Sequence, residues 1–226
     1  MSSMWSRRDV VTYGLAGVGL AATAPSVLMR VAAAQGSRSD NLRIPITMCH
    51  GIDEAKQRAP LTADHFERLI KVAADLGFES INYDALEAWR SNRGTLPRKP
   101  IMIDFDHPVR SMRYEVNDVL DRYGFKGNLF VNTGPMGPNY HGKLHDKEWM
   151  TWEEVGQLVE MGWFIGAHTV NHPNLSELSL EDPDGQKLRG ELRQCDETIE
   201  KELGIKPKAF AFTGTSFSTI ALEEVK

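Results

Sequence analysis

The chain has 226 residues, of which 41% are apolar and 25% are charged, with 19 Gly and 11 Pro. This composition is typical of a globular protein and excludes wholesale disorder, a fibrous repeat and a polytopic membrane protein. The formal charge of −5 argues against a nucleic-acid-binding surface. Two cysteines are too few for a disulfide scaffold, and we interpret Cys49 and Cys195 as unpaired small hydrophobes.

Residues 1–34 have the order of features found in an export signal. The pair Arg7-Arg8 precedes an uncharged stretch over residues 10–29, and small residues of the kind that a signal peptidase accepts follow at 32–34. This order resembles a twin-arginine (Tat) export signal. The resemblance implies the Tat export machinery as a partner and a periplasmic or extracellular destination.

The alternative interpretation of this segment is a membrane anchor, since about 20 residues can cross a bilayer. Three glycines, Pro25 and Arg30 weaken such a span, so cleavage is the prediction. The chain then divides into a signal peptide over residues 1–34, a polar linker over 35–42 and a domain over 43–226. We expect no stable membrane partner for the mature protein.

In the mature part, segments typical of strands and of amphipathic helices alternate along the chain. Strands are predicted at 44–48, 78–82, 101–105, 128–132, 163–167 and 208–212. Helices are predicted to begin at Thr62, Asp84, Ser111 and the capping box Thr151-x-x-Glu154, and to follow over 188–203 and beyond Ser218. The alternation predicts an α/β fold with a parallel sheet and helical crossovers. Because no nucleotide-binding glycine loop follows any strand, we favour a (β/α) barrel over an open doubly wound sheet.

Polar residues follow three of the predicted strands, at the end where a barrel enzyme carries its catalytic groups. Asp104, Asp106 and His107 end the third strand, the segment 168–172 follows the fifth, and His50 follows the first. If the third strand is regular, Asp104 and Asp106 face the same way, because side chains alternate along a strand. We expect these groups to meet at one mouth of the barrel.

The spacing of His168 and His172 is typical of a metal site, since an i, i+4 pair can place two imidazoles on one side of the backbone. A catalytic site needs a third protein ligand, for which His107, Asp106 and Asp104 are candidates. Imidazole and carboxylate ligands favour zinc, with cobalt, nickel or manganese as alternatives. Such a cation activates water for attack on a carbonyl carbon, and a nearby carboxylate can accept the proton. The residues thus indicate metal-assisted hydrolysis.

With these motifs, the chain from about Ile44 onward resembles the polysaccharide deacetylase family, also called carbohydrate esterase family four or the NodB-homology domain. The segment 168–173, HTVNHP, matches the family's H-[ST]-x-x-H-P motif in full. Residues 101–108, IMIDFDHP, stand where the family has an apolar strand ending in T-F-D-D-G. The resemblance implies a distorted (β/α) barrel of about seven strands. It also implies metal-dependent removal of N-acetyl groups from an amino-sugar polysaccharide or oligosaccharide.

The family's motifs, carried over position by position, imply a role for each matching residue. Asp106 is implied as the general base, and His107, His168 and His172 are implied as ligands of one divalent metal. His107 stands where the family has Asp, and three imidazoles suit zinc. Asp104 replaces a Thr or Ser of the family and is a second candidate for the base.

Two further departures concern the later part of the domain. Thr213-Gly214 lies where the family has a P-[YF]-G turn, whose backbone N–H stabilises the oxyanion of the reaction, and Thr213 replaces the proline. The family's last strand and its general-acid histidine are expected after Lys226, so the domain is predicted to be C-terminally truncated. His50 lies at a strand end and could enter the site, where we interpret it as an ordinary polar residue beside the cavity, with the role of the acid as the alternative.

Two other functions are compatible with this sequence. A cyclic amide or ureide hydrolase would keep the fold and change the substrate, but the complete H-x-x-x-H pair favours the metal-dependent deacetylase. A catalytically impaired, truncated glycan-binding relic would account for the departures at Thr213 and at the C-terminal end.

Overall fold

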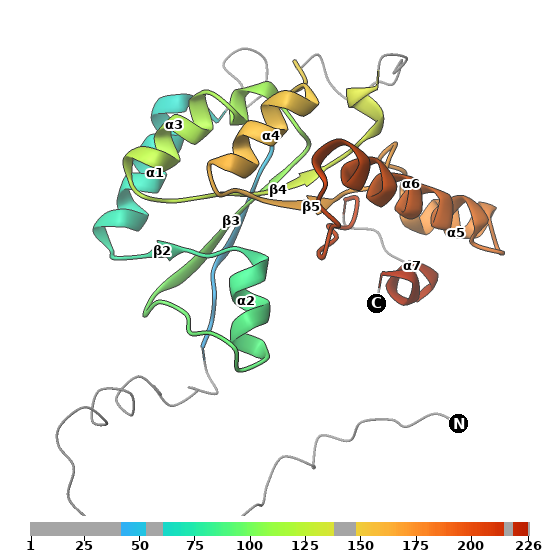
Figure 1. The fold of residues 1–226 in the computed structure, drawn as a ribbon, viewed down its shortest axis with the longest axis horizontal. Coiled ribbons are helices and arrows are strands. Elements are labelled where there is room, and N and C mark those ends of the chain that lie inside the picture. The colour runs from blue at the N-terminus through green and yellow to red at the C-terminus, as the bar shows by residue number, and fades with distance from the viewer. Residues whose placement is uncertain (1–41, 53–60, 138–147, 215–218, 226) are drawn as a thin grey trace, which may run out of the picture. The chain divides into compact units, whose positions relative to one another are not determined.

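Within the part of the chain that the structure describes, five short parallel strands form a central sheet (Figure 1). The computed structural model describes residues 42–52, 61–137, 148–214 and 219–225. The strands are β1 (Ile46–Cys49), β2 (Glu79–Ser80), β3 (Pro100–Asp106), β4 (Asn128–Val131) and β5 (Phe164–Ala167). In the described residues their order is β1-β3-β4-β5, and β2 pairs with the first residues of β3. All pairings are parallel, so the carboxyl ends of β1, β3, β4 and β5 lie along one edge.

The central strand β3 has two faces with different surroundings, although all seven of its residues are buried. Ile101, Ile103 and Phe105 belong to the hydrophobic core between the sheet and the helices. The alternate residues Asp104 and Asp106 lie on the opposite face, as the period of two along a strand requires. One face of β3 therefore stabilises the fold, and the other carries the carboxylates.

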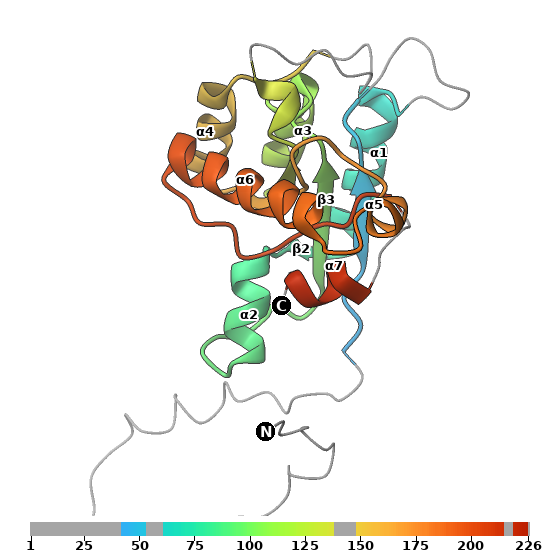
Figure 2. The ribbon, with the colours of Figure 1, turned by 90° about the vertical axis from the view of Figure 1, so that its right-hand side faces the viewer.

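Four helices supply the other half of this core. Helices α1 (Ala63–Asp75), α3 (Glu115–Arg122), α4 (Trp152–Glu160) and α6 (Gln186–Leu203) pack apolar side chains against the sheet. The remaining helices are α2 (Tyr83–Arg90), α5 (Leu175–Glu181) and α7 (Thr219–Glu224). Figures 1 and 2 show α1 beside α3 and α5 beside α6. Helices α1, α3, α4 and α6 thus cover the face of the sheet that carries no carboxylate.

Several helix ends lie where the sequence predicts them. The Thr62 hydroxyl accepts a backbone N–H and begins α1, and both hydrogen bonds of the capping box between Thr151 and Glu154 are present at the start of α4. Gly204 ends α6 in the left-handed conformation, with φ of 67°, which glycine adopts without steric cost. The predicted helix beyond Ser218 is α7.

Two predicted helix starts are wrong. Asn82, not Asp84, caps α2, because Asn82 has an extended backbone and its side chain accepts a backbone N–H of the first turn. Ser111 does not begin α3 but lies in a separate 3₁₀ helix, Arg110–Met112. Its hydroxyl instead accepts the N–H of Ile52 at 3.1 Å, so the side chain serves a long-range contact.

The predicted sixth strand, 208–212, is also wrong as a strand. Only Phe210 bridges to Ala167, the last residue of β5. Two backbone hydrogen bonds of 3.0 Å, between Ala167 and the residues on either side of Phe210, make this contact. Beyond Ala167 the chain turns away into the histidine segment, so the residues that follow this contact have no partner strand.

The α/β class with a parallel sheet and helical crossovers is confirmed. Both cysteines are free, as predicted, and Cys195 is buried. No helix in the described residues has the length and hydropathy needed to span a bilayer. The predicted signal peptide of residues 1–34 lies outside the described residues.

Candidate metal centre

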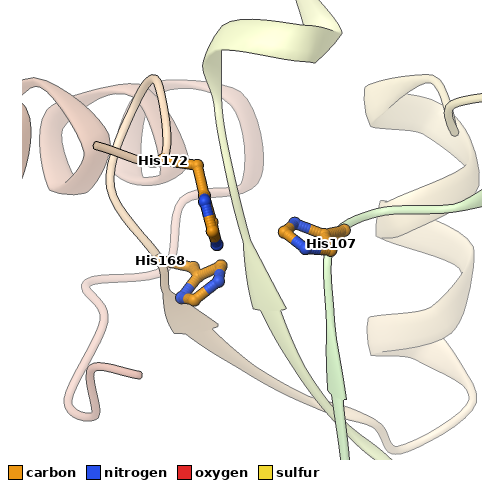
Figure 3. Close-up of side chains that lie close together, drawn as sticks. All are labelled: His107, His168 and His172. Carbon is orange, nitrogen blue, oxygen red and sulfur yellow. The ribbon is translucent and has the colours of Figure 1, made fainter. Parts of the chain in front are cut away.

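Three histidines from two different strand ends converge at the carboxyl edge of the sheet (Figure 3). His107 directly follows β3, whereas His168 and His172 belong to the segment after β5. One ring nitrogen from each lies within 4.8 Å of those from the other two. The ring centroids are 4.9 to 5.2 Å apart. Of the three candidates for the third ligand, the structure therefore brings His107 to the histidine pair.

An unusual backbone conformation aims these rings at one another. His107, Thr169 and His172 have positive φ angles of 68°, 68° and 55°. This left-handed region is costly for residues with a Cβ and is concentrated at functional sites. The Thr169 hydroxyl accepts the His172 N–H at 3.0 Å and closes the turn between the two histidines.

The imidazole of His168 is fully buried and is held in one orientation. Its Nδ1 donates to the Ala211 carbonyl at 2.8 Å. Its Nε2 has no hydrogen-bond partner, and this atom faces the cluster with Asp106 Oδ2 3.7 Å away. Burial lowers the pKa of His168 to about 3, and the neighbouring imidazoles act in the same direction, whereas the hydrogen bond to Ala211 acts against them. A neutral imidazole with a free Nε2 lone pair is the form that binds a metal.

Asp106 lies at the end of β3 beside the histidines. Its Oδ1 is buried without a hydrogen-bond partner. Burial and the nearby charge of Asp104 raise the pKa of Asp106 to about 7. A buried carboxylate with one open oxygen and a raised pKa is suited to exchange a proton near neutral pH.

Asp104 lies deeper on the same face and has different partners. Tyr83 donates its hydroxyl to Oδ2 at 2.6 Å, and Asn128 donates its amide to Oδ1 at 2.8 Å. Burial raises the pKa of Asp104, although both of these hydrogen bonds act in the opposite direction. Asp104 is therefore occupied by two neighbours, whereas Asp106 is aimed at the cluster.

His50 follows β1 and completes the edge of the site. Its Nε2 lies 4.0 Å from Asp106 Oδ2, and its ring centroid lies 5.4 Å from that of His107. With 54% of its side chain exposed, the imidazole stands between the buried carboxylate and solvent. The prediction that His50 enters the site from the first strand agrees with this placement.

The Thr213-Gly214 turn lies next to the histidine segment. The Thr213 side chain is buried and donates its hydroxyl to the carbonyl of Pro173, directly after His172, at 2.5 Å. Gly214 has φ of 64°. The threonine thus ties this turn to the histidine segment, and its role in oxyanion stabilisation stays a prediction.

Two residues that the sequence did not single out hold the histidines in place. Asn132, directly after β4, contacts both His107 and the backbone of His168. Glu191 of α6 accepts the backbone N–H groups of Val170 and Asn171 at 2.9 and 2.8 Å. Asn132 is polar at the carboxyl end of a strand, which is a usable signal, but nothing in the sequence marks Glu191.

The donor set fits a divalent cation. Three imidazoles in one small cluster are a ligand set of catalytic zinc, and the buried Nε2 of His168 and Oδ1 of Asp106 are otherwise without partners. His107, His168 and His172 are the residues that could hold the cation. Fold and cluster together define an α/β domain of the barrel type with a candidate metal centre at the carboxyl edge of its sheet.

Comparison with known families agrees with this class. The polysaccharide deacetylase family matches residues 93–226, more than half of the chain, and the chain belongs to this family. The protein YxkH of Bacillus subtilis (strain 168), which bears the name of a polysaccharide deacetylase, is 24% identical over 138 residues. The matched region is 61% of this chain and 46% of that protein, so the chain spans about half the length of this curated relative.

Solved structures show the same fold at low sequence identity. The deacetylase PplD of Streptococcus pyogenes, solved with acetate, matches with a TM-score of 0.68, 22% identity, and coverage of 81% of this chain and 79% of its own. A de-N-acetylase of Aggregatibacter actinomycetemcomitans matches with a TM-score of 0.71 and 16% identity, and the match covers 80% of this chain and 83% of that protein. IcaB of Ammonifex degensii matches with a TM-score of 0.67 and 20% identity, and the match covers 80% of this chain and 78% of that protein. These likenesses confirm the deacetylase-type (β/α) barrel fold.

Proposed function

We propose that the protein is a metal-dependent hydrolase that removes N-acetyl groups from an amino-sugar polysaccharide. The observation that carries this proposal is the convergence of His107, His168 and His172, whose ligand nitrogens lie within 4.8 Å of one another, beside Asp106, whose buried Oδ1 has no hydrogen-bond partner. Membership of the polysaccharide deacetylase family supports the substrate class.

The side chains at the site divide the chemistry of amide hydrolysis between them. A bound divalent cation would supply Lewis-acid polarisation of the acetyl carbonyl and would acidify water. Asp106, with its raised pKa and open Oδ1, accepts the proton of the attacking water. His50 is half-exposed and close to Asp106, so it can take a proton from solvent and donate it to the departing amine. The neutral imidazole of His168 remains a ligand and not an acid.

We also propose that the protein acts outside the cytoplasm, after Tat export and cleavage near residue 34. The support is the twin-arginine pair and the order of residues after it. N-terminal sequencing of exported protein tests this. Replacement of both Arg7 and Arg8 by Lys is expected to retain the precursor in the cytoplasm, and unchanged export would contradict the proposal.

The enzymatic proposal is tested by acetate release from N-acetylated oligosaccharides. The chain is freed of metal with a chelator and then reconstituted with zinc or cobalt. His168→Ala is expected to lose both metal and activity, and His65→Ala, an exposed histidine of α1 outside the site, is expected to retain both. Asp106→Asn is expected to keep the metal and lower the rate by about 10²- to 10⁴-fold.

Three results would overturn parts of this proposal. No stoichiometric metal in the wild type, together with unaffected activity of His168→Ala, would refute metal dependence. Full activity of Asp106→Asn would refute the assigned base and make Asp104 the next candidate. Hydrolysis of a cyclic amide or ureide without release of acetate from oligosaccharides would move the substrate class to the alternative.

A further inference from the structure

Asn132 is a buried polar residue that connects two of the three histidines. Its relative exposure is 0%, and it directly follows β4. Its Oδ1 is hydrogen-bonded to Nδ1 of His107, and its Nδ2 donates to the backbone carbonyl of His168. Within the described sheet β4 pairs with both β3 and β5, so a side chain at the end of β4 lies between the two strand ends that carry the histidines.

The backbone carbonyl of His168 determines the direction of both hydrogen bonds. A carbonyl oxygen can only accept, so the amide of Asn132 must turn its NH₂ group toward it. The amide oxygen of Asn132 then faces His107 and can itself only accept. Nδ1 of His107 must therefore carry the proton, which leaves the lone pair of this imidazole on Nε2.

The same tautomer is present at His168 for an independent reason. Its Nδ1 donates to the carbonyl of Ala211, which leaves Nε2 as the free atom. Two of the three imidazoles thus keep their lone pair on Nε2, and in both cases a carbonyl oxygen accepts the proton on the other nitrogen. Metal-ligating histidines characteristically donate their second ring N–H in this way, which fixes the ring and raises its basicity.

We propose that Asn132 is the positioning residue of the metal centre, an inference that rests on the proposed metal-dependent function. Asn132 holds His107 in the Nδ1–H tautomer and, through the carbonyl of His168, fixes the segment after β3 to the segment after β5. Replacing it leaves the buried Nδ1 of His107 without this acceptor and lets the ring rotate or change tautomer. The residue does not touch the reacting atoms and acts through the two ligands.

The test uses two substitutions of Asn132, one matched control at another buried asparagine, and a second background that lacks the His107 imidazole, all in the full chain. Asn132→Leu removes both hydrogen bonds at nearly constant volume. Asn132→Asp keeps an acceptor for Nδ1 of His107 and loses the donor to the carbonyl of His168. Asn117→Leu is the matched control, because Asn117 is also a buried asparagine, accepts the Trp163 indole N–H at 2.9 Å, and lies on α3. His107→Asp, alone and combined with Asn132→Leu, removes the imidazole through which Asn132 acts.

Two readouts are needed, and neither depends on activity. Imidazole ¹⁵N NMR of metal-free protein reports which ring nitrogen carries the proton. Competition with a chromogenic chelator reports the Zn²⁺ affinity. We expect Asn132→Leu to populate both tautomers of His107 and to weaken Zn²⁺ binding by about 10- to 100-fold. Asn132→Asp is expected to keep the Nδ1–H tautomer of His107, and Asn117→Leu is expected to keep both this tautomer and the Zn²⁺ affinity. In the His107→Asp background, the loss of Zn²⁺ affinity caused by Asn132→Leu is expected to shrink.

The outcomes separate this inference from the function on which it rests. Wild-type tautomer and wild-type Zn²⁺ affinity in Asn132→Leu would overturn it, and so would an equal loss of affinity in Asn117→Leu. If Asn132→Leu does not fold, loss of the Nδ1–H tautomer in Asn132→Asp would overturn it instead. Failure of the wild-type chain to bind Zn²⁺ would refute the proposed metal dependence, while the tautomer measurement on metal-free protein would still decide whether Asn132 orients His107.

Discussion

Glu191→Ala tests how the histidine segment after β5 is held. Glu191 lies on α6, and one carboxylate oxygen accepts the N–H groups of Val170 and Asn171 at 2.9 and 2.8 Å. The other oxygen accepts the side-chain amide of Asn171 at 2.7 Å. One substitution therefore removes three hydrogen bonds from the two residues that precede His172.

The size of the effect follows from these contacts. A hydrogen bond to a charged group contributes about 1.5–3 kcal/mol, but Glu191 is only partly buried and water can replace part of each bond. We therefore take about 1 kcal/mol for each bond and about 3 kcal/mol in total. For a domain of this length, that loss lowers Tm by roughly 6–12 °C. Because His172 directly follows the released residues, we also expect Zn²⁺ affinity to fall about tenfold.

The assays are thermal unfolding of the metal-free protein, followed by circular dichroism, and Zn²⁺ binding by chelator competition. The matched control is Glu197→Ala, an exposed glutamate on the same helix. Glu191→Ala should lower both Tm and affinity relative to this control. If the two variants have the same Tm and the same Zn²⁺ affinity, α6 does not hold the histidine segment and our reasoning is wrong.

Three further predictions follow from other contacts. Gly134→Ala should lose about 1–3 kcal/mol of stability in chemical denaturation, because a Cβ there would lie 2.6 Å from the carbonyl oxygen of Val170. The control Gly190→Ala should gain stability, because its Cβ would meet no atom within 4 Å. A gain of stability in Gly134→Ala would contradict this packing. Burial alone would raise the pKa of Glu154, but the hydrogen bonds that its carboxylate accepts, including one from Arg110, lower this pKa. Glu154 therefore stabilises the fold at pH values above the ordinary glutamate pKa, and this contribution is lost as the pH falls through the lowered pKa. The stability difference between wild type and Glu154→Gln should therefore be largest near neutral pH and shrink in acid, and a difference that grows in acid would reverse the assigned sign. Zn²⁺ at about one hundred times its Kd should add about 2.7 kcal/mol to the stability of the wild type, and a Tm that does not respond to Zn²⁺ or to its chelation would argue against a site formed only in the folded chain.

The candidate ligands could be predicted because their signal is local. His168 and His172 stand four residues apart after an apolar run, and His107 stands at the end of another. Parallel pairing places both segments at the same edge of the sheet, whereas the left-handed backbone that aims the rings at one another is not visible in the sequence. The position of Asn132 at the end of a predicted strand marks it as a candidate, but its contacts with His107 and His168 span 25 and 36 residues, so a local pattern does not show which residues it holds.

The errors in the fold have the same origin. Residues 208–212 have the composition of a strand, but pairing stops at Phe210 because β5 has already ended beside it. Asn82 and Asp84 are both residue types that cap helices, and the choice between them depends on which one has the extended backbone. Ser111 has the right chemistry for a cap but is used by the N–H of Ile52, 59 residues earlier.

The alternation of carboxylate and apolar side chains along β3 also disfavours incorrect pairing registers of this strand. A slip of one residue in its pairing with β1 or β4 would turn Asp104 and Asp106 toward the helices and would turn Phe105 away from them. Burying a carboxylate among apolar side chains without a partner is far more costly than losing one packing contact. The same two residues that equip the site therefore exclude the competing registers, so substituting them by apolar residues would remove a safeguard of correct folding along with the chemistry.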